Sequence, residues 1–268
     1  MTILINWKEL QKRIINGKEV TKVIQWWVQV RPNPSPWDNY LCFTSRDSWA
    51  RLSLLNIFGL SAHPVELEFS YDKITWSDYQ WMTPWVWKTI QANRVWEKVY
   101  FRNKSAIPTL FSTDWEVCYK FRASDGDWDV SWDVWFLLCK YSTLSMPESC
   151  FDSLFSYFPT RTAPLLPATT LGVGCYRNMF GNCDYLEQLP SLPATILPST
   201  CYKAMFADCP NIKISEQQSA SYPTPYRIPS SWTWSGNVWT QIMFEGTWWT
   251  FTWTPSINTT YYTSNTIV

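Results

Sequence analysis

Glycine is the most conspicuous shortage in this chain. Only 8 of its 268 residues are glycine, whereas a typical soluble protein of this length carries roughly 19. Tryptophan is in surplus, with 20 residues, and many stand in Asp-, Ser- and Thr-rich stretches such as 127–133 and 246–253, which are typical of turns. Turns often need φ > 0, which glycine adopts freely and a bulky side chain does not.

This imbalance leads to a hypothesis about translation. We hypothesise that many of the tryptophans are encoded by UGA in a genome whose own machinery reads UGA as glycine. Such residues should project from turns, some of them with φ > 0, whereas Trp76 should be buried among Phe, Tyr and Leu. The alternative is an aromatic strip that binds sugars. The residues tested are Trp128, Trp132, Trp234, Trp248, Trp249 and Trp253.

Residues for catalysis and metal binding are also scarce. The single histidine, His63, restricts any Ser-His-Asp arrangement to one position, and the phosphate-binding patterns GxxxxGK[ST] and GxGxxG are missing. The cysteines lack the paired spacing of zinc sites. The acidic run from Asp125 to Asp133 lacks the glutamate of an EF-hand, which leaves calcium as a minor alternative. We therefore assign no catalytic, cofactor-binding or metal-binding residue and expect no enzyme and no cofactor.

Charge and hydropathy exclude further classes of partner. The 22 basic and 22 acidic residues cancel, which argues against nucleic-acid binding. The longest apolar stretch is far shorter than the roughly 20 residues of a membrane span, so no membrane insertion is expected. The N-terminal residues alternate charged with apolar side chains and lack the apolar region of a secretory signal.

A repeat of about 26 residues is the strongest positive feature. Leu166–Cys183 reads LPATTLGVGCYRNMFGNC and Leu192–Cys209 reads LPATILPSTCYKAMFADC. A degenerate copy begins at Cys150, and a weaker one is expected at Met243 and Phe244. Repetition at this period indicates a solenoid, with a short strand and a helical turn in each copy. The expected structural repeat core is Leu171, Cys175, Tyr176, Met179, Phe180, Cys183, Leu197, Cys201, Tyr202, Met205, Phe206 and Cys209.

The pattern CYxxMFxxC with an intervening LPAxxL resembles the BspA-type leucine-rich repeats of bacterial surface proteins and of gut-associated bacteriophages. The resemblance covers roughly residues 136–268 and implies a binding or structural role on a cell or particle surface. The alternative is an unrelated helical array. The repeated cysteines are interpreted as buried thiols, with disulfides as a second possibility.

The chain is expected to be β-rich with two domains. Residues 1–36 are interpreted as an attachment arm with a stiff Pro-rich linker. Residues 37–138 hold short alternating runs separated by turn residues, which predict an all-β, Ig-like sandwich. Residues 139–268 are assigned to the leucine-rich-repeat domain, with α/β repeat units and a C-terminal cap. Within the sandwich, Ser70 to Trp76 resembles an Asp-box turn and is interpreted as a β-hairpin with Trp76 packed inward.

These expectations favour a non-enzymatic recognition or structural protein. The first candidate is a bacteriophage virion component, such as a fibre, decoration or tail-associated protein, that binds a protein or glycan on a host surface or on the particle. The second is a bacterial cell-surface adhesin, and the third is a carbohydrate-binding or carbohydrate-active protein. The expected localisation is accordingly the virion, the extracellular space or the cell surface. Apolar side chains in residues 1–36 suggest assembly through this segment, with a homo-oligomer as one form of it.

Overall fold

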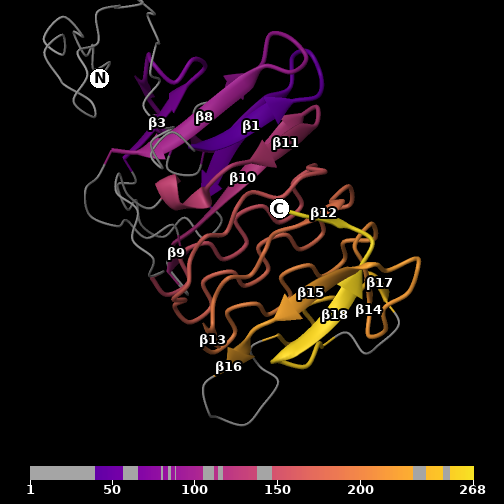
Figure 1. Cartoon of the computed structure of the whole chain (residues 1–268). Coiled ribbons are helices and arrows are strands. Elements are labelled where there is room, and N and C mark those ends of the chain that lie inside the picture. The colour runs from indigo at the N-terminus through magenta and orange to yellow at the C-terminus, as the bar shows by residue number, and fades with distance from the viewer. Residues whose placement is uncertain are drawn as a thin grey trace, which may run out of the picture. The chain divides into compact units, whose positions relative to one another are not determined.

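A computed structural model of the chain is shown in Figure 1. The chain divides into two compact units, Met1–Asp38 and Asn39–Val268, and the account below concerns the second. The expected attachment arm, residues 1–36, lies outside the described residues. The structure describes residues 40–56, 66–79, 81–83, 86–87, 89–104, 112–113, 117–137, 147–231, 240–249 and 254–268.

The first sheet is antiparallel and has the strand order β11-β1-β8-β3-β4. Buried and half-buried side chains alternate along β11, as expected for a sheet with one face on a core. The strands are β1 (Leu41–Ser45), β3 (Leu67–Ser70), β4 (Ser77–Asp78), β8 (Lys98–Asn103) and β11 (Trp128–Ser131).

The second sheet has the strand order β5-β6-β2-β10-β9, and β7 also pairs with β2. Its central pair joins β2 to the long β10 in antiparallel register, with Leu54 opposite Phe121. The strands are β2 (Arg51–Asn56), β5 (Trp81–Thr83), β6 (Val86–Trp87), β7 (Ile90–Gln91), β9 (Ser112–Thr113) and β10 (Val117–Asp125).

Aromatic side chains fill the space between these two sheets. The Phe43 ring of β1 lies 4.6 Å from the Phe121 ring of β10, measured between centroids, and the Phe101 ring of β8 lies 5.4 Å from the same ring. All three side chains are fully buried. The expected all-β character is therefore confirmed, with two antiparallel sheets packed on a common core.

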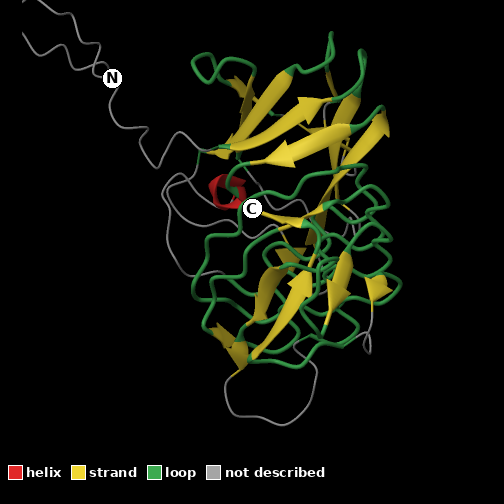
Figure 2. Cartoon of the chain, turned by 45° about the vertical axis from the view of Figure 1, so that its right-hand side comes forward, coloured by secondary structure: helices red, strands yellow, loops and turns green. Residues whose placement is uncertain are grey.

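The expected helical turns are missing from the described part of residues 147–268, so the predicted α/β character of the repeat units is wrong. Turns and short strands make up this region, and the red helix in Figure 2 is η3 (Val134–Leu137), which precedes it. Three strand pairs are parallel: β12 with β19, β13 with β16, and β14 with β17. The strands are β12 (Gln188–Leu189), β13 (Ile196–Leu197), β14 (Lys213–Ser215), β15 (Thr224–Ile228), β16 (Ser230–Ser231), β17 (Trp248–Trp249), β18 (Thr259–Thr263) and β19 (Thr266–Ile267).

The repeat region is joined to the first sheet along the edge of β11. The Trp128 amide donates to the Pro159 carbonyl at 3.2 Å, and the Leu165 amide donates to the Trp132 carbonyl at 2.7 Å. This segment covers polar groups that an edge strand would otherwise present to solvent. The expected domain boundary near residue 138 falls within residues 138–146, which lie outside the described ranges.

Within the described ranges, no helix has both the length and the apolar character needed to cross a membrane.

Candidate recognition surface on the stacked turns

Backbone hydrogen bonds connect successive copies of the repeat. The Phe155 amide donates to the Met179 carbonyl, the Phe180 amide to the Met205 carbonyl, and the Phe206 amide to the Met243 carbonyl, each at 2.9 Å. Equivalent positions of neighbouring copies therefore lie directly side by side. The chain arranges four such copies in a stack, and the fourth contains Met243 and Phe244, where the weak copy was expected.

A left-handed residue recurs at every fourth position of each copy. These residues limit the turns to hydrogen bonds between residues three apart, as from the Ser156 amide to the Ser153 carbonyl at 3.0 Å. A left-handed residue cannot continue a right-handed helix, which explains why the expected helical turn does not form. The positions are Ser149, Ser153 and Tyr157, then Gly174, Asn178 and Asn182, then Thr200, Ala204 and Asp208, and finally Ile242 and Gly246.

The inner side of the stack is a column of parallel aromatic rings. The centroid distances are 5.7 Å from Phe155 to Phe180, 5.6 Å from Phe180 to Phe206 and 5.5 Å from Phe206 to Phe244, with interplanar angles of 13°, 2° and 11°. A second row pairs Tyr176 with Tyr202. The expected repeat core is buried throughout: Leu171, Cys175, Tyr176, Met179, Phe180, Cys183, Leu197, Cys201, Tyr202, Met205, Phe206 and Cys209.

The repeat cysteines are free thiols inside this column. Cys183 Sγ donates to the Phe155 carbonyl and Cys209 Sγ to the Phe180 carbonyl, both at 3.0 Å. Burial raises the pKa of the Cys175 and Cys201 thiols above the ordinary value. The thiolate is the nucleophilic and metal-binding form of cysteine, so these thiols are suited to packing and not to chemistry.

A row of polar side chains occupies one equivalent position in each copy, where Asp152 is buried, Arg177 and Lys203 are half-buried and Gln241 is exposed. Arg177 of the second copy bonds Asp152 of the first, with Nε 2.8 Å and Nη2 2.5 Å from Oδ2. Lys203 and Gln241 occupy the corresponding positions of the third and fourth copies. This outer row, defined here as residues 152, 177, 203 and 241, changes from acidic to basic to neutral while the inner column stays apolar.

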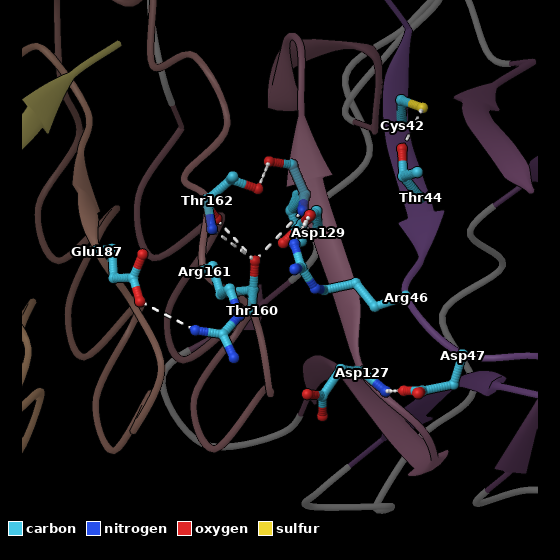
Figure 3. A network of polar contacts seen from close by, with 11 residues as sticks. Cys42, Thr44, Arg46, Asp47, Asp127, Asp129, Thr160, Arg161, Thr162 and Glu187 are labelled. Carbon is cyan, nitrogen blue, oxygen red and sulfur yellow. Dashed lines mark hydrogen bonds and ion pairs between the residues drawn. The ribbon is translucent and has the colours of Figure 1, made fainter. Parts of the chain in front are cut away.

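A second group of charged side chains lies where the stack meets the first sheet (Figure 3). Arg46 Nη1 lies 2.7 Å from Asp129 Oδ2, and Arg161 Nη1 lies 2.9 Å from Glu187 Oε1. Asp47 Oδ2 accepts the Asp127 amide at 2.8 Å. Burial, together with the nearby Asp47 carboxylate, raises the pKa of the Asp127 carboxyl.

The acidic run from Asp125 to Asp133 is therefore partly tied to neighbouring loops. Gly126 adopts φ +66°, and a Cβ at this position would lie 2.8 Å from the Ala50 Cβ, so the approach of the two loops requires glycine. Among the described residues, no group of three or more His, Cys, Asp or Glu side chains is placed to hold a metal ion. The geometry gives no support to the calcium alternative.

The Asp-box-like segment forms the expected β-hairpin between β3 and β4. Asp72 Oδ1 accepts the Ile74 and Thr75 amides at 2.8 and 2.7 Å, and these bonds lower the pKa of the Asp72 carboxyl to about 2. Trp76 is only partly buried. Its ring contacts Tyr40, and the Arg102 guanidinium lies 3.9 Å from its centroid, so the expected burial among apolar side chains is wrong.

The remaining tryptophans agree only in part with the hypothesis that they occupy glycine positions. Trp128 is fully buried, which contradicts its expected exposure, and its Nε1 has no hydrogen-bond partner in the described structure. Trp132 has φ 72°, as expected for a position suited to glycine, but is only partly exposed. Trp248 and Trp249 lie in β17 and not in a turn, whereas Trp234 and Trp253 lie outside the described residues.

Two features escaped the sequence-based prediction. Trp49 and Trp96 were not selected, yet they have φ 70° and 65° and are each 60% exposed. The Asp152–Arg177 pair was also missed, although Asp152 stands about one period before Arg177, and opposite charges at equivalent positions of neighbouring copies are a readable signal. The Trp49 and Trp96 conformations had no such signal, because neither residue lies in a run of turn-forming residues as marked as 127–133.

Comparisons with known proteins do not assign the chain to a family. No family model matches it, and neither the curated proteins nor the solved structures give a significant match.

Proposed function

We propose that the chain is a non-enzymatic recognition protein of a bacteriophage virion, a fibre, decoration or tail-associated component. Its BspA-type leucine-rich-repeat solenoid is formed by the stacked turns and binds a protein or glycan on a host surface or on the particle. The observation that carries this proposal is the difference between the inner and outer positions of each copy. The inner positions repeat as a buried apolar column, whereas the outer row is acidic in the first copy, basic in the second and third and neutral in the fourth.

The stacking geometry supports a binding role in two ways. Ladder hydrogen bonds and stacked rings hold the copies at fixed spacing, so outward side chains are presented on a preorganised surface, which reduces the entropy lost on binding. The side chains with chemical reactivity are withdrawn from that surface, because the described repeat cysteines are buried. Both properties suit recognition better than catalysis.

A bacterial cell-surface adhesin would use the same surface, and localisation separates the two. An antibody against the repeat region should label phage particles purified from a culture that carries the gene, and peptides of the chain should be found in those particles by mass spectrometry. Detection only in the cell envelope would favour the adhesin. Detection in neither fraction would contradict both.

A competition experiment tests recognition itself. The purified chain should reduce adsorption of the phage to its host, and the combined variant Arg177→Ala, Lys203→Ala and Gln241→Ala should compete at least about ten-fold more weakly if the outer row is a contact surface. A matched variant at the exposed Glu216, Gln217 and Gln218 should compete like the parent. Equal competition by both variants would place the contact elsewhere, and no competition by the parent would contradict the proposal.

A further inference from the structure

The backbone separates the described tryptophans into two classes. Outside the repeat turns, the described residues other than glycine that adopt left-handed φ are Trp49, Lys73, Trp96, Trp132 and Asn258. Asparagine tolerates this conformation because its short side chain bonds locally, whereas bulky residues rarely adopt it. Three of these five positions nevertheless carry tryptophan, the largest side chain.

Hydrogen bonds to neighbouring strands and loops fix the backbone at all three positions. The Trp49 amide donates to the Ala92 carbonyl at 3.0 Å, and the Trp96 amide donates to the Ser45 carbonyl at 2.8 Å. The Trp132 carbonyl accepts the Leu165 amide at 2.7 Å. Each residue also lies within two residues of a strand end, at β2, β8 and β11 respectively. The left-handed φ at these three positions is thus held by the backbone hydrogen bonds that connect strand ends to neighbouring strands and loops.

The side chains of the exposed pair contribute little to the core. Trp49 and Trp96 are each 60% exposed, and the Arg46 guanidinium lies 5.3 Å from the centroid of the Trp96 ring. Trp128 differs in exposure and in backbone conformation, because it is fully buried in the core and its φ is not left-handed. Trp76 also has ordinary φ, and its Nε1 donates to the Lys73 carbonyl at 3.2 Å.

We infer that Trp49, Trp96 and Trp132 occupy positions built for glycine, and that the native cell translates their codons, UGA, as glycine. Trp76 and Trp128 are tryptophan in the native protein as well. This assignment explains why tryptophan occupies these three left-handed positions, and it accounts for part of the glycine shortage and of the tryptophan surplus. It revises the sequence-based hypothesis, because it removes Trp128 from the proposed glycine positions and adds Trp49 and Trp96.

The codons provide the first test. The gene should carry UGA at positions 49, 96 and 132 and UGG at positions 76 and 128. Peptides of the protein from its native source should contain glycine at the three UGA positions by mass spectrometry. UGG at the three positions, or tryptophan in the native peptides, would overturn the inference.

Stability of the expressed chain provides an independent test. Trp49→Gly, Trp96→Gly and Trp132→Gly should each raise the folding equilibrium constant, by roughly two- to five-fold, because relief of left-handed strain exceeds the entropy cost of glycine. The control Trp128→Gly should lower it strongly, since it opens a cavity in the core. If the parent chain does not fold, the triple glycine variant should still unfold cooperatively in denaturant.

The opposite result in these tests would favour a functional role for the tryptophans. Strained residues can be retained for function, and the exposed Trp49 and Trp96 side chains would then each serve to bind a sugar. Glycine variants that lose stability as Trp128→Gly does, or UGG codons together with binding of Trp49 and Trp96 to a glycan array, would show that the tryptophans are the protein's own.

Discussion

Arg177 and Lys203 occupy the same repeat position, yet their surroundings differ. The Arg177 guanidinium bonds a carboxylate of the preceding copy, and the Asp152 side chain is only 10% exposed. The repeat pattern alone predicts that substitutions at either residue cost little, within about 0.5 kcal/mol, as for an ordinary surface position. The structure leads to a different expectation for Arg177, because its removal takes a charged hydrogen-bond donor from a mostly buried carboxylate.

Arg177→Ala should therefore lower the free energy of unfolding by about 1.5–3 kcal/mol, the usual range for hydrogen bonds to charged groups. Lys203→Ala is the matched control and should change it by less than about 0.5 kcal/mol. Urea unfolding of both variants measures the difference. Equal losses at the two positions would show that the ion pair adds nothing to stability.

The turn is the element that the sequence predicted least well. Recurrence of Phe180 as Phe206, and of Cys175 as Cys201, identified the inner column, because identical apolar residues at one period must meet when copies stack. The left-handed positions carry different residue types in each copy, such as Ser153, Asn178 and Ala204. No residue type marked them, so a helical turn was expected where a chain of tight turns forms.

Phe180 tests the packing of this element. Its ring stacks between those of Phe155 and Phe206, and Phe180→Ala should reduce the free energy of unfolding by about 3–5 kcal/mol, as expected for a buried aromatic whose removal leaves a cavity. Val173→Ala, at a 40% exposed position of the same copy, should cost less than about 0.5 kcal/mol. A thermal melt in which both variants behave alike would contradict a column that supports the stack.

At the scale of the whole molecule, the first copy rests on the second sheet. The Phe121 ring of β10 stacks on Phe155 at 5.8 Å with an interplanar angle of 13°, and the Phe121 amide donates to the Leu154 carbonyl at 2.9 Å. Alternation in the sequence predicted the strands, and periodicity predicted the copies. Neither pattern shows that β10 continues the aromatic column, because Phe121 belongs to a strand and stands outside the repeat.

This contact predicts the behaviour of fragments. A fragment of residues 139–268 would expose the Phe155 ring and the Leu154 carbonyl and should unfold at a clearly lower temperature than residues 39–268. Circular dichroism melts of the two fragments make the comparison. Cooperative unfolding of the shorter fragment at the same temperature would show that the repeat region is stable without the sheets.

The spacing of four residues between left-handed positions limits how such a chain can change in length. Inserting one residue within a copy would shift each later left-handed position and move Phe180 or Phe206 out of line with its neighbours. Duplicating a whole copy would preserve the ladder of hydrogen bonds and stacked rings, because the turns of each copy bond those of the next. Gene recombination could therefore lengthen or shorten this surface in steps of one copy, with the side chains of the outer row free to diversify afterwards.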